Sequence, residues 1–229
     1  MIGRPADVEA FLARLVRLDP VALVRLRVGA TQTTLWGRVP WDVLVSRTLV
    51  GLSSADGEPP DGEPPDGELS DGDFVVRASD WLTAPATSDV RTLTRRDAGW
   101  RTALPPLRRE VLEEVPGDEL RGLGVAAADT LRATEAGGVG GRAVGARAVR
   151  DALLDHIAIV VSAGPRRVEV PQRLVQAVVR MGFAAADEPV RVLAAGQWIG
   201  LAAAYGTAWW RPSTGLGLTP AKRTASHRG

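Results

Sequence analysis

The chain carries few groups that perform acid–base or nucleophilic chemistry at neutral pH. It has no cysteine, one tyrosine (Tyr205) and two histidines, and His227 lies in a polar C-terminal stretch. Because most nucleophilic, metal-assisted and general-base mechanisms use Cys or His, this composition argues against the commonest enzyme chemistries. His156 is the single imidazole that we expect within the fold. Asp151 or Asp155 could tune it as a proton shuttle, but the isoleucines that follow favour a structural role on an apolar helix face.

Adjacent carboxylates are the remaining candidates for hydrolytic chemistry. An enzyme that uses two carboxylates holds them across a cleft at a defined separation, whereas neighbours in sequence point apart. We interpret the pairs as helix-end and solubility charges. They are Glu113–Glu114, Asp118–Glu119 and Asp187–Glu188. The absence of cysteine excludes disulfides and a thiolate metal site, and the sequence predicts no catalytic residue, no metal ligand and no cofactor.

Three of the seven tryptophans fall close together near the C-terminus, at Trp198, Trp209 and Trp210. Side chains alternate along a strand, so Trp209 and Trp210 must point to opposite faces of a sheet. One ring is then buried, and the other is a candidate exposed anchor for a partner, because tryptophan is enriched at binding sites. The alternative is that these rings only cap the core of a small sheet.

The first half of the chain predicts one helix followed by an antiparallel sheet. Apolar residues recur at helical spacing over residues 6–18, and alternating or β-branched stretches predict strands at 24–28, 32–39, 43–50 and 74–77. Ser79 is a candidate cap for a short helix. Residues 56–73 read DGEPPDGEPPDGELSDGD. This low-complexity repeat has no hydrophobic period and predicts a flexible acidic loop, 53–73.

The second half is helical and ends in a β-meander. We expect helices at 118–134 and 147–161, with 157–161 as an alternative strand, and a helix from Pro171 to a C-cap at Gly182. Short strands follow at 190–194, 198–202 and 207–211. Residues 83–116 are expected to form an extended segment wrapped over the sheet. The predicted class is therefore α+β, with regions 1–116 and 117–212 and a disordered tail at 213–229.

Composition places the chain in a broad class. At 229 residues with 45% hydrophobic residues it can bury a real core. Its longest apolar runs fall far short of the roughly 20 residues that span a bilayer, and its start lacks an apolar signal core, so we expect a cytoplasmic protein with no membrane partner. A net charge of +1 gives no global attraction to nucleic acid. Lys222 is the only lysine, an arginine bias that GC-rich codons produce.

Element order in the last 100 residues resembles a winged helix-turn-helix domain. The segment PQRLVQAVVRMGF is similar to its third helix and VRVLAAGQWIGL to its wing. The resemblance implies that the third helix enters the major groove of DNA and that the wing touches the backbone. Carried over to this chain, Gln172, Arg173, Gln176 and Arg180 would face DNA, with Arg191 at the wing. The wing departs from the family because it is apolar and carries a tryptophan.

Over nearly its whole length the chain also resembles an uncharacterised family of cytosolic proteins from high-GC actinobacteria. The similar stretches are AFLARLVRLDPVALVRLR, RRDAGW, DALLDHIAIVV and EVPQRLVQAVVRMGF. This resemblance implies a compartment and a source group, and it assigns no site residue.

The sequence favours a non-enzymatic binding or protein-interaction protein. Its candidate partner surface combines the tryptophans of the meander with the arginine-flanked helix before it: Arg173, Gln176, Arg180, Arg191, Trp198, Trp209 and Trp210. A protein is the expected partner, with nucleic acid as the alternative. Two other functions stay open, a DNA-binding regulator of winged-helix type and an enzyme that uses only carboxylates and arginines.

Overall fold

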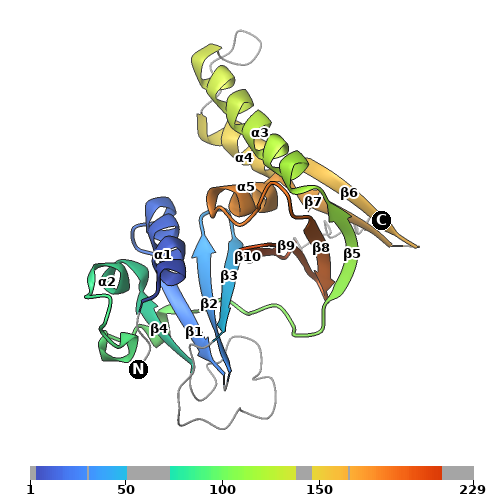
Figure 1. Ribbon diagram of the computed structural model, residues 1–229. Coiled ribbons are helices and arrows are strands. Elements are labelled where there is room, and N and C mark those ends of the chain that lie inside the picture. Colours follow the sequence, from blue (N-terminus) through green and yellow to red (C-terminus); the bar gives the residue numbers. More distant parts are fainter. Residues whose placement is uncertain (1–3, 30, 51–72, 138–145, 165, 213–229) are drawn as a thin grey trace, which may run out of the picture.

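The computed structural model, shown in Figure 1, describes residues 4–29, 31–50, 73–137, 146–164 and 166–212. Most of the predicted acidic loop, at 53–72, and the predicted disordered tail at 213–229 lie outside the described residues. Asp73, the last residue of the acidic repeat, lies inside them.

Within these residues, eight strands form one antiparallel sheet in the order β4-β1-β2-β3-β10-β9-β8-β5, and two strands form a separate hairpin, β6-β7. The strands of the large sheet are β1 (Leu23–Val28), β2 (Gln32–Val39), β3 (Val43–Val50), β4 (Asp73–Arg77), β5 (Glu110–Val115), β8 (Val190–Ala195), β9 (Trp198–Ala203) and β10 (Gly206–Trp210). Those of the hairpin are β6 (Ile157–Ala163) and β7 (Arg166–Pro171). The predicted α+β class and the C-terminal three-stranded meander are confirmed.

The large sheet is built from two similar halves. Helix α1 (Ala6–Leu18) precedes the meander β1-β2-β3, and helix α5 (Gln172–Arg180) precedes the meander β8-β9-β10. In each half a further strand pairs with the first strand of the meander on its outer side, β4 with β1 and β5 with β8. The halves meet where β3 pairs with β10, with Ser46 opposite Thr207. Residues far apart in the sequence therefore share one sheet.

One face of this sheet is covered by α1, α5 and the short helix α2 (Ala78–Thr83). Helix α1 buries Phe11, Leu12 and Leu15 here, as its 3.6-residue period predicts. The ring of Phe11 stacks on that of Phe183, just after α5, with centroids 6.4 Å apart. The main core thus joins both halves of the chain.

The opposite face is crossed by an extended segment, residues 93–109, that we call the strap. Trp100 of the strap packs in a second apolar cluster with Trp36, Trp198 and Trp209 of the sheet. The Trp100 indole N–H donates to the Thr102 carbonyl at 2.7 Å. The predicted extended segment over the sheet is present, with two 3-10 turns, η1 (Val90–Thr92) and η2 (Asp97–Gly99).

Helices α3 (Gly117–Gly137) and α4 (Ala146–Asp155) project away from the sheet and are attached to it through α5 (Figure 1). On α3, a Cβ added to Gly124 would lie 2.8 Å from a Val179 methyl, so the two helices approach closely at a residue without a side chain. The Gln176 amide donates to the Gly124 carbonyl at 2.8 Å, and the Gln172 amide to the Leu123 carbonyl at 3.2 Å. Among the described helices, none has the length and apolarity that crossing a membrane requires.

Residues 157–161, for which the sequence left helix and strand open, form strand β6. Three local expectations are corrected. Strands β5 and β7 were not expected. Ser79 does not cap α2, whose N-cap is Arg77. Asp73 does not belong to a flexible loop, because it begins β4 and is 4% exposed.

Candidate interaction groove

Arg173, in the first turn of α5, connects three segments at one end of the sheet. Its guanidinium donates to the Trp41 carbonyl at 2.7 Å and forms an ion pair with Asp155 at the end of α4. The same guanidinium lies over the ring of Trp210, 5.7 Å from the centroid. The side chain is only 16% exposed. A mostly buried arginine with these contacts holds the end of β10, the end of α4 and the β2–β3 turn in a fixed arrangement.

The β2–β3 turn has an unusual backbone. Trp41 and Asp42, the last two of the three residues between β2 and β3, have φ angles of 83° and 60°, the left-handed region that glycine or asparagine normally fills. For non-glycine residues this conformation costs about 1 to 3 kcal/mol each and persists only where surrounding contacts hold it. Those contacts are present: Arg173 binds the Trp41 carbonyl, Arg180 lies 5.8 Å above its ring, and Arg38 pairs with Asp42.

A groove of about 420 Å³ opens beside this turn, and we call it the tryptophan groove. Arg211 lies over Trp198 at 5.3 Å, as Arg173 lies over Trp210. The groove is lined by four arginines and two aspartates together with these two rings. Its principal residues are Arg38, Asp42, Arg101, Asp155, Arg173, Trp198, Trp210 and Arg211.

Charge in the tryptophan groove is unbalanced. Asp42 is paired with Arg38 and Asp155 with Arg173. Arg101 and Arg211 are exposed and have no carboxylate partner among the described residues. A neighbouring cavity of about 490 Å³ shares Arg38, Asp42, Arg101 and Thr102 and extends the groove toward Val21, which is 62% exposed. The arrangement offers aromatic and apolar surface beside free positive charge.

The structure brings three of the predicted surface residues together in this groove: Arg173, Trp198 and Trp210. The alternation of Trp209 and Trp210 is as expected, with Trp209 1% exposed and Trp210 partly exposed. Trp209 packs on Gly200 of the next strand, where an added Cβ would lie 2.7 Å from its ring. The other three predicted residues lie elsewhere: Arg180 over Trp41, Gln176 buried against α3, and Arg191 exposed on β8.

The winged-helix arrangement does not match the observed element order. The hairpin β6-β7 lies between α4 and α5, so α5 does not follow a helical pair directly. Helix α5 covers the sheet, and Gln172 and Gln176, which the resemblance directed toward DNA, are 4% and 7% exposed with their amides bound to α3. The segment that resembled a wing is the pair β8-β9 inside the eight-stranded sheet.

His156 is not on a buried helix face. It is exposed at the bend between α4 and β6, where its carbonyl accepts the Gln172 backbone N–H at 2.7 Å. The expectation of a packed imidazole fails because α4 ends at Asp155. The three adjacent carboxylate pairs are exposed. Among the described residues, no group of three or more His, Cys, Asp or Glu side chains could hold a metal ion.

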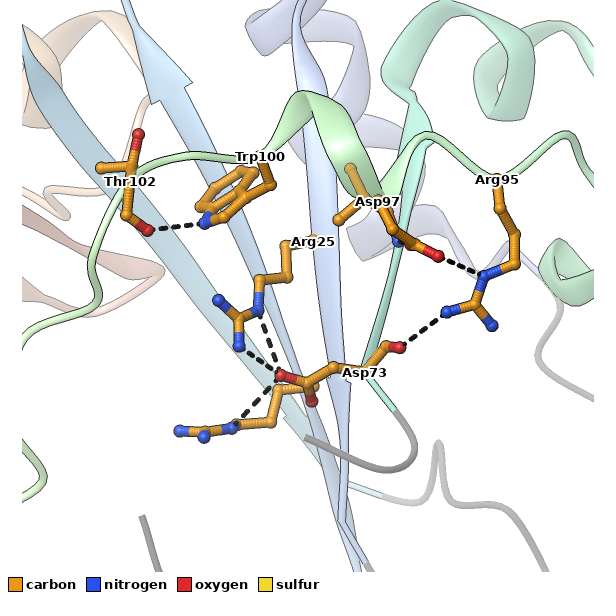
Figure 2. Close-up of polar contacts among 8 residues, drawn as sticks. Arg25, Asp73, Arg95, Asp97, Trp100 and Thr102 are labelled. Atoms are coloured by element: carbon orange, nitrogen blue, oxygen red, sulfur yellow. Dashed lines mark hydrogen bonds and ion pairs between the residues drawn. The ribbon is translucent and has the colours of Figure 1, made fainter. Parts of the chain in front are cut away.

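Sequence reasoning missed a buried charge network beneath the strap, drawn in Figure 2. Arg25, 1% exposed, donates to Asp73 Oδ2 from Nη2 at 2.6 Å and from Nε at 3.0 Å. Arg27 lies 3.8 Å from the same oxygen. Arg95 of the strap binds both the Asp73 carbonyl and the Asp97 carboxylate, whose other oxygen accepts the Val75 N–H. The network fastens strap, β1 and β4 together.

A signal for this network was present in the sequence. Arg25 and Arg27 alternate with Val24, Leu26 and Val28, which placed the arginines on the face opposite the core. Alternation cannot show that the strap covers that face.

Two family models match the chain. Residues 3–102 match a domain of unknown function (DUF8010), and residues 104–215 match another domain of unknown function (DUF8185). Both matches fit the expectation of an uncharacterised family. No curated protein matches the sequence.

The fold resembles that of DNA polymerase III β sliding clamps. A β sliding clamp of C. crescentus superposes with a TM-score of 0.54 at 11% identity, covering 90% of this chain and 62% of the clamp. The β subunit of the DNA polymerase of Streptococcus pyogenes gives 0.53 at 14% identity (89% and 61%), and the sliding clamp of Pseudomonas aeruginosa gives 0.51 at 12% (97% and 66%). The chain therefore spans less than two thirds of the length of these clamps, and the likeness concerns the fold.

Proposed function

We propose that this chain is a non-enzymatic interaction protein that holds an acidic, partly apolar segment of a partner protein in the tryptophan groove. The observation that carries the proposal is the convergence of Trp198, Trp210, Arg101 and Arg211 on one open groove from separate parts of the chain. Tryptophan and arginine dominate the residues that contribute most to protein–protein affinity.

The charges of the groove support a binding role and select an acidic partner. Both aspartates are already paired with arginines in the unbound chain. Arg101 and Arg211 have no carboxylate partner among the described residues, so they can pair with carboxylates of a partner protein. Charge complementarity of this kind steers association and excludes basic partners. The rigid arrangement around Arg173 and the strained Trp41–Asp42 turn reduces the entropy lost on binding.

The structural neighbours agree with this role in general terms. They include a DNA polymerase β subunit and a DNA polymerase sliding clamp. Identities of 14% or less support the fold, so the proposed partner chemistry depends on the groove of this chain.

Selection from a random dodecapeptide library tests the proposal. We expect peptides rich in Asp and Glu around an apolar residue, and we expect Trp210→Ala or Arg101→Glu to weaken their binding at least tenfold, about 1.4 kcal/mol. Arg132→Ala is the matched control, because Arg132 is exposed on α3 and, among the residues that the structure describes, pairs only with Asp129. Fluorescence anisotropy measures each affinity, and circular dichroism checks folding.

Two outcomes would contradict the proposal. The first is that selected peptides bind the groove variants as tightly as the parent chain. The second is that a single-stranded oligonucleotide binds the groove while acidic peptides do not, which would make nucleic acid the partner.

A further inference from the structure

A second groove lies at the opposite end of the strap face, about 400 Å³ in volume, and we call it the hydroxyl groove. It is separate from the tryptophan groove, since the two share no lining residue. Its floor is made by β2, β3 and β10, and its walls by Leu107 and Arg109 of the strap and by the β9–β10 turn at residues 204–206. Volumes of this size accommodate small-molecule ligands.

Four hydroxyl groups line its floor in two adjacent rows across the sheet. Ser46 and Thr207 stand opposite each other where β3 meets β10, and Thr34 and Thr48 stand opposite each other one step along. The Thr34 and Thr48 hydroxyls bond each other at 3.0 Å. Ser46 is 7% exposed. Its hydroxyl and that of Thr207 have no hydrogen-bond partner among the described residues. Both hydroxyls line the groove and are free to donate to a ligand bound there.

Arginines supply an excess of positive charge around these hydroxyls. Arg27, which lines the groove, lies 3.8 Å from Asp73 Oδ2, the oxygen that already accepts two hydrogen bonds from Arg25. Arg109 is exposed, lies over Trp209 at 5.7 Å and has no carboxylate partner in the described chain. Arg47 also lines the groove but is paired with Asp7. No Asp or Glu of the described residues lines it.

From this geometry we infer that the hydroxyl groove binds a phosphate-bearing small molecule. Guanidinium groups with serine and threonine hydroxyls are the donors that proteins use for phosphate oxygens. Arg27 belongs to β1 and Arg109 lies over Trp209 of β10, so the two arginines flank β2 and β3, and Ser46 and Thr207 line the floor. The strap and the β9–β10 turn bound the groove, which favours a compact ligand over a nucleic acid strand.

Calorimetric titration with inorganic pyrophosphate at low ionic strength tests the inference. We expect saturable binding that Arg109→Ala weakens about tenfold and that Ser46→Ala weakens about threefold to tenfold. Removing Arg109 breaks no ion pair of the described structure, so this variant should fold, and circular dichroism verifies it. Arg132→Ala, on the distant helix α3, should bind as the parent does, and so should Trp210→Ala.

Three results would overturn the inference. The first is that pyrophosphate does not bind the folded chain at millimolar concentration. The second is that it binds Arg109→Ala and Ser46→Ala as tightly as the parent. The third is that a ten-nucleotide single strand binds the groove and pyrophosphate does not displace it, which would assign the groove to nucleic acid. Unchanged peptide selection in Arg109→Ala separates this inference from the proposed function.

Discussion

Asp73 has a different role in the structure from the one that its sequence context predicts. In the sequence it ends an acidic repeat, where a carboxylate reads as a solvated charge. In the structure it is buried and accepts hydrogen bonds from Arg25, with Arg27 close by. The difference arises because β4 pairs with β1 at this residue, with Asp73 opposite Arg27.

We expect Asp73→Ala to lower the free energy of unfolding by about 3 to 5 kcal/mol, because it removes the buried carboxylate that accepts two hydrogen bonds from the Arg25 guanidinium. Urea unfolding measures the change. Asp129→Ala, which breaks the exposed pair with Arg132, is the matched control and should cost no more than about 1 kcal/mol. Equal effects of the two variants would show that the buried pair contributes no more to the free energy of unfolding than the exposed pair.

His156 illustrates the reverse case, an expected core residue that is exposed. Its imidazole lies at the bend after α4, so His156→Gln should change stability by no more than about 0.5 kcal/mol. Thermal unfolding and peptide affinity of the same variant provide the check. A loss of partner binding at unchanged stability would point to a functional imidazole and would argue against a non-enzymatic protein.

At the scale of elements, helix α1 and the two meanders followed from periodicity and turn residues. Strands β5 and β7 did not, because Glu113, Glu114, Arg167 and Glu169 make these segments read as polar loops. Both strands keep one face in solvent, and charge there is compatible with pairing. The local sequence predicted Trp198, Trp210 and Arg173 as surface residues. Arg101 and Arg211 reach the same groove only because of the strap and the long-range pairing of β10 with β3.

The attachment of α3 to α5 can be tested with two glycines on the same helix. An added Cβ at Gly122 meets nothing within 4 Å, so Gly122→Ala should stabilise the protein by about 0.5 to 1 kcal/mol through helix propensity. Gly124→Ala should destabilise it by about 1 to 3 kcal/mol, since the methyl group collides with Val179. Chemical denaturation of both variants measures the difference, and equal shifts would mean that α3 does not pack closely on α5.

At the scale of the whole molecule, the sheet passes through both regions that the sequence predicts, 1–116 and 117–212. The β3–β10 and β5–β8 pairs and the Phe11–Phe183 stack all join them. We therefore expect one cooperative unfolding transition that coincides in far-UV circular dichroism and tryptophan fluorescence. A fragment of residues 117–212 that folds alone, or two separated transitions, would show two independent domains.

The pairing of β3 with β10 also determines when β3 can complete its hydrogen bonds during translation. Arg47 and the Tyr205 carbonyl that it binds are 158 residues apart, an interval that a ribosome needs on the order of ten to thirty seconds to translate. Throughout that interval one edge of β3, whose sequence is VLVSRTLV, has no partner strand. Its β-branched residues favour association with other chains. Arg47 stands in the middle of this strand, where a charge opposes such association. The nascent chain is thus most exposed to aggregation before its last strand emerges.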